Sequence, residues 1–410
     1  MLKTFYYKVR KVNEENPKKP FFRRKYEDFA CTKLSPNHEP QPETQTNMKI
    51  IYFSLDYTPH DHRFLAALAE SDHQVYYVRL QRGPRQTEDR PVPEKIEQVL
   101  WEGGQGVFRW RDVPKYVLGL RKVIKRIQPD LIHAGPIQTC AFIAMLTGFR
   151  PILTMSWGFD LMKDVHRGYW WTQITQYVLR NTTFFTSDAD VTRDTAVQYG
   201  MNPQQTIVFP WGVDLQHFTQ KNWSLNTEHS FTVFCNRSWE PNYGVDVLAR
   251  AFARVAGQRP EVSLLLLSGG SQGHVIRQIL NSGGVIERVT FAGQVGQRDL
   301  PRYYHMADLY VSPSHVDGSS VSLMEALACG LPCLVSDIPA NKEWVFEGQN
   351  GWLFPDGDVT ALAEKILAVM EKRKTLAEIG KNARQVAEER ADWKKNFAKL
   401  LDAYEQTMRQ

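Results

Sequence analysis

The sequence predicts an α/β protein built from two doubly wound, Rossmann-like domains in tandem. The chain has 410 residues, whereas single cores stop growing at about 250–300 residues. From Met48 onward, short apolar runs alternate with amphipathic helical patterns, which is typical of a parallel sheet covered on both faces. The alternation stops over residues 210–230 and then resumes, so we expect a linker there.

Short apolar runs mark the strands of each expected sheet. The first domain should hold strands at 49–54, 74–80, 131–134, 151–156, 182–187 and 206–209, and the second at 231–236, 262–268, 288–292, 308–312 and 332–336. The clearest helix runs over 113–127, where apolar residues recur at steps of three and four. We expect Asp112 to be its N-cap and Pro129 to mark its end.

These patterns give the domain boundaries. We expect a first domain over 48–215, a second over 216–392, and a last helix within 393–410 that packs back on the first domain. Residues 1–47 carry ten Lys and Arg against six Asp and Glu, and 35–47 contain almost nothing that could be buried. Two explanations stay open for this extension: a disordered arm, or a start codon assigned too early, because Met48 directly precedes the first strand.

Composition excludes several classes of protein. The five cysteines lack the spacing of a zinc site and predict reduced, buried thiols. No apolar run reaches the roughly 18–20 residues of a membrane span, and no signal core opens the chain. We therefore expect a cytoplasmic protein, with any membrane contact peripheral and at the inner face. Most of the net charge of +5 lies in residues 1–47, which disfavours a nucleic-acid partner.

The most informative stretch follows the expected strand 308–312. Asp317-Gly318-Ser319-Ser320 forms a turn that opens a helix at Val321. The free N–H groups and positive dipole of a helix start suit a diphosphate. Asp317 and Glu325 can both reach one extended ligand, and carboxylates suit sugar hydroxyls. From the residues alone an alternative stays open, in which Asp317 only caps the helix and Glu325 is a solvated helix residue.

The same stretch resembles the signature of glycosyltransferase family 4, the group-1 glycosyltransferases. In that signature an acid is followed, after seven residues, by Glu-Ala and then Gly-x-Pro, which here are Asp317, Glu325-Ala326 and Gly330-Leu331-Pro332. The resemblance covers roughly residues 48–410 and implies a GT-B fold, with two Rossmann-like domains facing across a cleft. It implies a hexosyltransferase that uses a nucleotide-diphosphate sugar and a glycan, lipid or small-molecule acceptor, in cell-surface polysaccharide or glycolipid synthesis.

The resemblance also implies roles for individual residues. Glu325 should hold the ribose of the donor, Asp317 should face the donor sugar, and Arg237 should neutralise the leaving diphosphate. Further donor-binding residues are Gly318, Ser319, Ser320, Val321, Tyr243, Gly293 and Val295. This sequence departs from the family pattern twice here, with Asp317 in place of Glu and Tyr243 in place of Lys. Tyr243 offers a hydrogen bond but no positive charge at neutral pH.

In the first domain, Trp157 stands where the family has His. Its ring could stack on a sugar, in which case Trp157 belongs to the catalytic site, or it could simply be part of the core. His60, Arg63 and Asp160 are the predicted acceptor-side residues. His60, Asp61 and His62 could also suggest a metal site, but the cluster has no third distant ligand.

By the same resemblance the transfer is retaining, needs no metal, and uses no cofactor beyond the donor sugar nucleotide. The acceptor attacks from the front face, and the departing diphosphate takes its proton. Three alternatives remain: a sugar-nucleotide epimerase of the same fold, a catalytically weak sugar-nucleotide-binding relative, and, least favoured, an NAD oxidoreductase. The last lacks the glycine fingerprint G-x-G-x-x-G after a strand.

Overall fold

The computed structural model describes residues 47–81, 88, 90–223 and 230–410. The predicted extension, apart from Asn47, lies outside the described residues, and so do residues 224–229 of the predicted linker.

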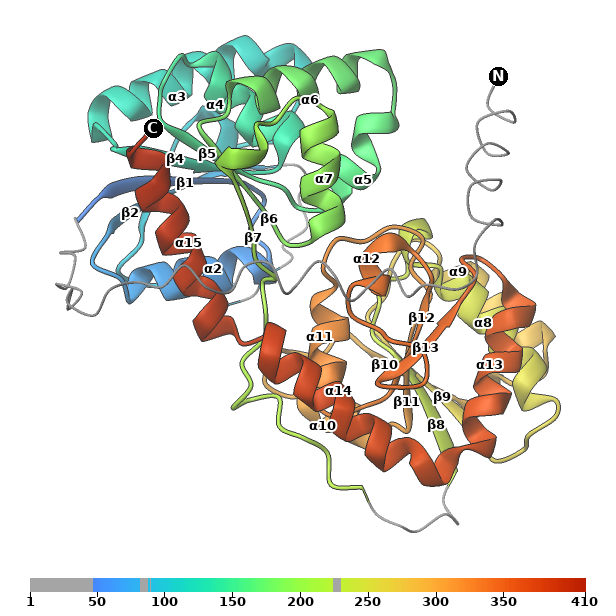
Figure 1. Ribbon diagram of the computed structural model, residues 1–410. Helices are drawn as coiled ribbons and strands as arrows, with labels where there is room; N and C mark the ends of the chain where they lie inside the picture. Colours follow the sequence, from blue (N-terminus) through green and yellow to red (C-terminus); the bar gives the residue numbers. More distant parts are fainter. Residues whose placement is uncertain (1–46, 82–87, 89, 224–229) are drawn as a thin grey trace, which may run out of the picture. The chain divides into compact units, whose positions relative to one another are not determined.

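The first sheet has seven parallel strands in the order β3-β2-β1-β4-β5-β6-β7. Figure 1 labels these strands except β3. Its strands are β1 (Lys49–Leu55), β2 (Gln74–Leu80), β3 (Glu97–Val99), β4 (Leu131–Ala134), β5 (Ile152–Met155), β6 (Phe184–Ser187) and β7 (Thr206–Val208). Its helices are α2 (Pro59–Ala69), α3 (Val113–Ile127), α4 (Phe142–Leu146), α5 (Phe159–Met162), α6 (Tyr169–Asn181) and α7 (Asp190–Gln198).

The second sheet has six parallel strands in the order β10-β9-β8-β11-β12-β13. Its strands are β8 (Phe231–Cys235), β9 (Val262–Leu267), β10 (Val289–Gly293), β11 (Leu309–Ser312), β12 (Cys333–Ser336) and β13 (Gly351–Phe354). The helices that follow are α8 (Val245–Ala256), α9 (Gly273–Ser282), α10 (Leu300–Met306), α11 (Val321–Ala328), α12 (Pro339–Lys342), α13 (Val359–Glu371), α14 (Leu376–Arg390) and α15 (Trp393–Met408).

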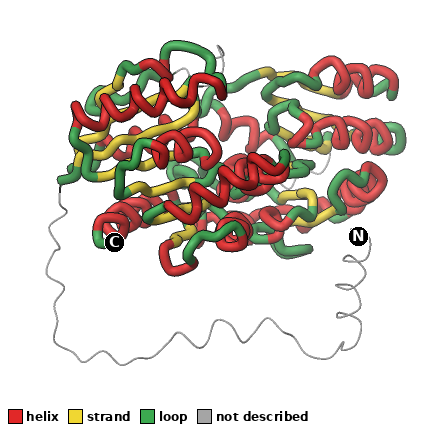
Figure 2. Tube along the Cα trace, turned by 90° about the horizontal axis from the view of Figure 1, so that it is seen from above, coloured by secondary structure: helices red, strands yellow, loops and turns green. Residues whose placement is uncertain are grey.

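Each sheet is buried on both faces, which explains why its strands are continuous apolar runs. Along β1, Ile50 and Tyr52 pack with residues of α2 and α15, whereas Ile51 and Phe53 pack with residues of α3 on the other face. Successive side chains of a strand point to opposite faces, so β1 alone contributes to two cores. Figure 2 shows the strands lying between layers of helices. The predicted fold class, two doubly wound α/β sheets in tandem, is confirmed.

The strand order reverses once in each sheet, between β1 and β4 and between β8 and β11. In open parallel sheets, ligands bind beyond the carboxyl ends of the strands at such a reversal, because the loops there diverge to the two faces and leave a crevice. The loops after β1, β4, β8 and β11 are therefore the places to look for a site.

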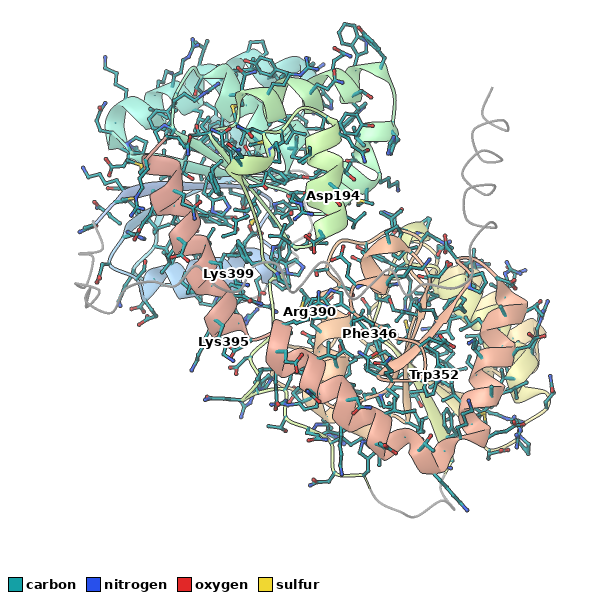
Figure 3. The ribbon with its side chains drawn as sticks, viewed as in Figure 1. Asp194, Phe346, Trp352, Arg390, Lys395 and Lys399 are labelled. Carbon is teal, nitrogen blue, oxygen red and sulfur yellow. The ribbon has the colours of Figure 1, made fainter. Side chains whose placement is uncertain are left out.

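The chain passes between the two sheets twice, and the two crossings lie side by side. The Val213 N–H donates to the Ala391 carbonyl at 2.7 Å, and the Trp393 N–H donates to the Val213 carbonyl at 3.1 Å. Beyond this point α15 lies on the first sheet, where the Tyr404 hydroxyl is 2.7 Å from Nδ1 of His133 on β4. Figure 3 labels Arg390 before the crossing and Lys395 and Lys399 after it.

Some predicted local features differ from the structure. Strands β3 and β13 were not predicted, because β3 is a three-residue edge strand with two exposed positions and β13 has no apolar run longer than Trp352-Leu353-Phe354. Helix α3 has the predicted bounds, but Asp112 occupies its N-cap position without a side-chain hydrogen bond. Within the described part of the chain, no helix combines the length and apolar character that crossing a membrane requires.

Candidate functional site

A cavity of about 480 Å³ lies where the carboxyl ends of the two sheets face each other. The first sheet contributes His60 and Arg63, at the start of α2, and Trp157, after β5. The second sheet contributes Arg237, after β8, and the segment 317–322, after β11. These are the strand ends at and beside the two reversals of strand order, so the topology accounts for the position of the cavity.

The loop before α11 forms one wall of the cavity. Ser320 is the N-cap of α11, and its Oγ accepts a hydrogen bond from the Leu323 N–H at 3.4 Å. The alternative in which Asp317 serves only as the helix cap is therefore wrong. Gly318, Ser319, Ser320 and Val321 all line the cavity, and the first turn of α11 points its backbone N–H groups toward this wall.

Arg237 and Asp317 form an ion pair within the cavity. Nη2 of Arg237 lies 2.6 Å from Oδ2 of Asp317, and the two side chains are only 10% and 16% exposed. Nη1 of Arg237 also donates to Oγ of Ser320 at 2.8 Å and to Oγ of Ser322 at 2.9 Å. Burial raises the pKa of Asp317, while the Arg237 guanidinium opposes that shift.

The Arg237 guanidinium is held flat by an aromatic ring. It lies over the ring of Tyr243, 4.3 Å from the ring centroid, in a cation–π arrangement. The pKa of Arg237 stays above its ordinary value, because the attraction of Asp317 and the surrounding groups outweighs the cost of burial. The guanidinium is therefore permanently charged, and its buried Nε has no hydrogen-bond partner. Tyr243 supports the cation and adds no charge of its own.

Glu325 lies one side-chain layer deeper, on the second turn of α11. It is 3% exposed, and its carboxylate accepts from Nε2 of Gln297 at 2.9 Å and from the hydroxyl of Tyr304 at 2.8 Å. Burial raises its pKa, and these two hydrogen bonds together with Arg63 oppose the rise. The alternative in which Glu325 is a solvated helix residue is therefore wrong.

The first-domain wall is aromatic. The Trp157 ring packs edge-to-face on Trp211 with centroids 5.6 Å apart, and His60 lies 4.7 Å from the Trp211 ring. The indole N–H of Trp157 and Nδ1 of His60 are both buried without a partner. Burial, aided by Arg63 and Arg237, lowers the pKa of His60 to about 3, so this imidazole is neutral. Trp157 thus belongs partly to the cavity wall and partly to the core.

Of the other two predicted acceptor-side residues, Arg63 lines the cavity and Asp160 does not. The Arg63 guanidinium donates to the Gly212 carbonyl at the crossing between the sheets. The Asp160 carboxylate accepts from the hydroxyl of Ser156 at 2.5 Å and from the N–H of Ile137 at 3.1 Å. The acceptor contact predicted for Asp160 is corrected: it shapes the loop that carries Trp157, whose N–H it also accepts at 3.2 Å.

The side chains of His60, Asp61 and His62, considered above as a possible metal site, make different contacts. The Asp61 carboxylate accepts from Oγ1 of Thr58 at 2.6 Å and completes a capping box at the start of α2. Nδ1 of His62 lies 2.8 Å from the hydroxyl of Tyr57. The side chains of His60, Asp61 and His62 thus have separate environments, and a shared metal site has no support.

Gly293 and Val295, two predicted donor-binding residues, do not line the first cavity. Gly293 ends β10, and its carbonyl accepts from the Ser268 N–H at 2.6 Å. Val295 lines an adjoining cavity of about 1220 Å³, which shares Pro59, Arg63 and Gln297 with the first. Gln297, which lines both cavities, donates to Glu325.

Several residues of the site were missed from the sequence. Ser322 and Gln297 hold Arg237 and Glu325 in place, and nothing in the local pattern distinguishes them from other polar residues. Asp188 follows the predicted strand 182–187 directly, and a carboxylate at the carboxyl end of a parallel strand is a signal that could have identified it. It lines the cavity and accepts from the Ser319 N–H at 2.6 Å.

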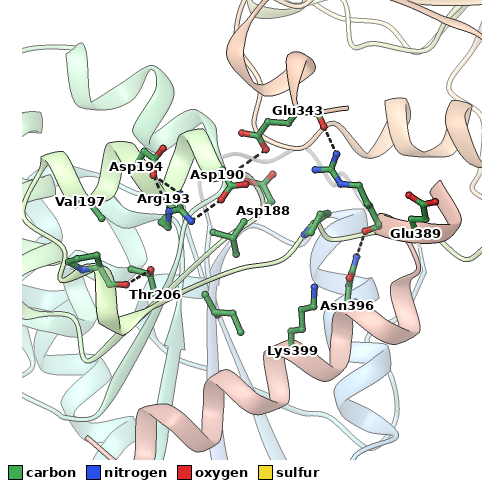
Figure 4. A pocket seen from close by; sticks show the side chains of 15 residues that line it. Asp188, Asp190, Arg193, Asp194, Val197, Thr206, Glu343, Glu389, Asn396 and Lys399 are labelled. Atoms are coloured by element: carbon green, nitrogen blue, oxygen red, sulfur yellow. Dashed lines mark hydrogen bonds and ion pairs between the residues drawn. The ribbon is translucent and has the colours of Figure 1, made fainter. Parts of the chain in front are cut away.

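A second cavity, of about 750 Å³, lies between α7, α15 and the segment around Glu343 (Figure 4). Arg193 there pairs with Asp190 at 2.8 Å and with Asp194 at 2.7 Å. Glu343 accepts from the N–H groups of Asp190 and Val191 at the start of α7, at 3.2 and 2.9 Å. These contacts join α7 to the segment around Glu343, and Asp188 lines both cavities.

Comparison with known proteins matches both halves of the chain to family models. Residues 217–386 match the model described as "Glycosyl transferases group 1", and residues 60–217 match "Glycosyltransferase Family 4". The chain is similar to the phosphatidyl-myo-inositol mannosyltransferase of Mycobacterium leprae, with 31% identity over 175 residues, which are 42% of this chain and 46% of that protein. The chain thus spans about half the length of the curated relatives it matches first.

Solved structures resemble this chain over a larger part of its length. Sucrose-phosphate synthase from Thermosynechococcus elongatus aligns with a TM-score of 0.75 at 19% identity, over 88% of this chain and 99% of that one. Anabaena Alr3699/HepE in complex with UDP and glucose aligns with a TM-score of 0.70 at 20% identity, over 88% and 100%. At this identity the likeness concerns the fold.

Proposed function

Because the chain belongs to the group 1 and family 4 glycosyltransferases, we propose that it transfers a sugar from a nucleotide-diphosphate donor to an acceptor hydroxyl in the cavity between its sheets. The observation that carries the proposal is the cluster of Arg237, Asp317 and the start of α11, with Glu325 behind it. A buried cation beside a helix start is suited to a diphosphate, and the carboxylates are suited to hydroxyls.

In the proposed reaction, the bond between the anomeric carbon and the phosphate oxygen breaks while the acceptor oxygen bonds to the same carbon. The acceptor's proton passes to the departing diphosphate, so charge and atoms balance without a further reactant. Negative charge grows on the diphosphate as the bond breaks. Arg237 is charged and fixed before the reaction begins, so it stabilises this charge without reorganising.

We further propose that transfer is retaining, proceeds by front-face attack, and needs neither a metal nor a cofactor besides the donor. Arg237 and the N–H groups at the start of α11 supply the positive potential that a metal would otherwise give. Glu325 would accept hydrogen bonds from the ribose, and Asp317 would face the sugar. Trp157 would cover the apolar face of a sugar ring, on the acceptor side of the cavity.

The relatives support a sugar-nucleotide donor in different forms. Alr3699/HepE is described in complex with UDP-glucose, and a relative from Mycolicibacterium smegmatis is named as a GDP-mannose-dependent mannosyltransferase acting on a phosphatidylinositol monomannoside. We propose a glycan or a lipid-linked sugar as acceptor. Synthesis of a cell-surface polysaccharide or glycolipid would be the setting of such a reaction.

One observation favours a second candidate, a sugar-nucleotide-binding protein with weak transfer activity. Tyr243 stands where the family pattern has Lys, and its ring lies against Arg237 rather than adding a second charge. A site with one cation less would still bind a donor while stabilising its departing diphosphate less well.

The test is a panel of UDP- and GDP-sugars incubated with the protein, with and without candidate acceptors, while released nucleotide is measured. Release that depends on acceptor and is lost in Arg237→Ala supports transfer. Donor binding without release supports the weak relative, and isomerised sugar nucleotide would instead identify an epimerase. If no sugar nucleotide binds at all, the proposed function is wrong.

A further inference from the structure

Asp188 is a buried carboxylate that the transfer reaction described above does not use. It follows β6 of the first sheet and is 4% exposed. It lines the cavity beside Asp317 and Ser319, and it also lines the second cavity shown in Figure 4. Burying a carboxylate is costly unless its oxygens are hydrogen-bonded, so its contacts need an explanation.

The hydrogen bonds of Asp188 are incomplete. Oδ2 accepts from the Ser319 N–H at 2.6 Å, across from one sheet to the other, whereas the buried Oδ1 has no hydrogen-bond partner. The approach of the loop depends on Gly318, where an added Cβ would lie 2.6 and 2.7 Å from the two carboxylate oxygens. The first-domain carboxylate thus lies directly against the loop that we propose holds the donor.

This pair of groups has the chemistry of a hydroxyl site. The Ser319 N–H already donates to Oδ2, so a hydroxyl that donates to Oδ1 would complete the hydrogen bonding of this carboxylate. A phosphate oxygen placed here would instead face the carboxylate with like charge. The anion is therefore better placed on the other side of the loop, where Arg237 lies.

We propose that Asp188 contacts a hydroxyl of the donor's sugar and helps to decide which sugar the protein accepts. The inference rests on the proposed function and adds a specificity-determining residue to it. Asp188 follows a strand of the first sheet, and the loop that carries Ser319 follows a strand of the second, so the hydroxyl would be recognised where the two domains meet. A donor whose hydroxyl points away at that ring position would leave the buried Oδ1 of Asp188 without a hydrogen-bond partner.

The test compares Asp188→Asn and Asp188→Ala with the unchanged protein by calorimetric titration of UDP, GDP and the matching sugar nucleotides. Affinity for the bare nucleoside diphosphate should stay within about twofold. Affinity for the preferred sugar nucleotide should fall roughly tenfold to a hundredfold in Asp188→Ala, the range of a lost charged hydrogen bond. Asp190→Asn is the control, because that carboxylate pairs with Arg193 at the second cavity, and it should bind as the unchanged protein does.

A second measurement uses epimeric or deoxygenated donors, which differ from the preferred donor at one ring position. The unchanged protein should discriminate against a donor altered at one ring position, and Asp188→Ala should lose most of that discrimination. The inference is overturned if both Asp188 variants bind the sugar nucleotide as tightly as the unchanged protein does. It is also overturned if affinity for the bare nucleotide falls as much as affinity for the sugar nucleotide, which would indicate a structural role. If the unchanged protein binds bare nucleotide and sugar nucleotide equally, the inference also fails while donor binding stands. If it binds neither, the proposed function itself is wrong.

Discussion

Replacing Arg237 with Ala should lower both the stability of the fold and kcat, and the two effects can be measured separately. The change removes the guanidinium whose Nη2 lies 2.6 Å from Oδ2 of Asp317. It leaves the Asp317 carboxylate, which is only 16% exposed, without its ion-pair partner. Breaking a buried ion pair from one side costs about 3–5 kcal/mol, and the residual exposure places this pair near the lower end. Independently, loss of a preorganised group at a developing anion should lower kcat by about 10²–10³.

The double variant Arg237→Ala/Asp317→Asn separates the two effects. Removing the stranded charge should recover most of the lost stability, because the remaining amide is neutral. It should not recover kcat, because no cation then faces the diphosphate. Denaturant unfolding gives the first quantity and acceptor-dependent nucleotide release the second. Arg193→Ala is the control, since that residue's ion pairs lie outside the first cavity, and it should cost about 1 kcal/mol or less. Recovery of kcat in the double variant would refute the catalytic role of Arg237.

Three other predictions follow from particular residues. Glu325→Ala should raise the KM for donor roughly tenfold to a hundredfold with kcat nearly unchanged, because ribose binding is the same in ground and transition states; an unchanged KM in steady-state kinetics would contradict it. Burial raises the pKa of Asp188 to about 7 from 3.8, so the native chain binds more protons than the unfolded one and loses stability as pH rises through this window. In denaturant titrations, the free energy of unfolding of Asp188→Asn relative to the unchanged protein should therefore rise by up to about 4 kcal/mol between pH 4 and 8. A difference in unfolding free energy that does not change with pH would contradict the raised pKa. A chain starting at Met48 should melt within a few degrees of the full chain, and vesicle flotation of the two chains tests whether residues 1–47 give contact with anionic lipid; equal flotation would rule that contact out.

Most of the fold could be predicted because its signals are local. Each long strand of a two-sided parallel sheet must be apolar throughout, and each covering helix must repeat apolar residues every three to four positions, so β1 and α3 are visible in the sequence. The elements that were missed have weak local signals, because β3 and β13 are held mainly by pairing with neighbouring strands.

The candidate site was predictable only in part. Asp317 and Glu325 lie eight positions apart around a helix start; their spacing permits a shared ligand, and the resemblance to the family signature favoured that interpretation over capping. Arg237 was expected near the diphosphate, but its pairing with Asp317 joins residues 80 positions apart and no local pattern encodes it. Asp160 follows a strand of the sheet as a site residue would, but its carboxylate accepts hydrogen bonds from Ser156 and Trp157 and so supports the loop that carries Trp157.

The sequence by itself determined most strands of the two sheets, the family signature after β11 and the candidate acids, because each of these depends on residues that lie close together in the sequence. Only the tertiary structure decided which groups meet. Asp188 and Ser319 are 131 positions apart and follow strands of different sheets, yet the Ser319 N–H donates to Oδ2 of Asp188 at 2.6 Å. Such a contact depends on how the two domains pack against each other, and no pattern of neighbouring residues specifies that packing.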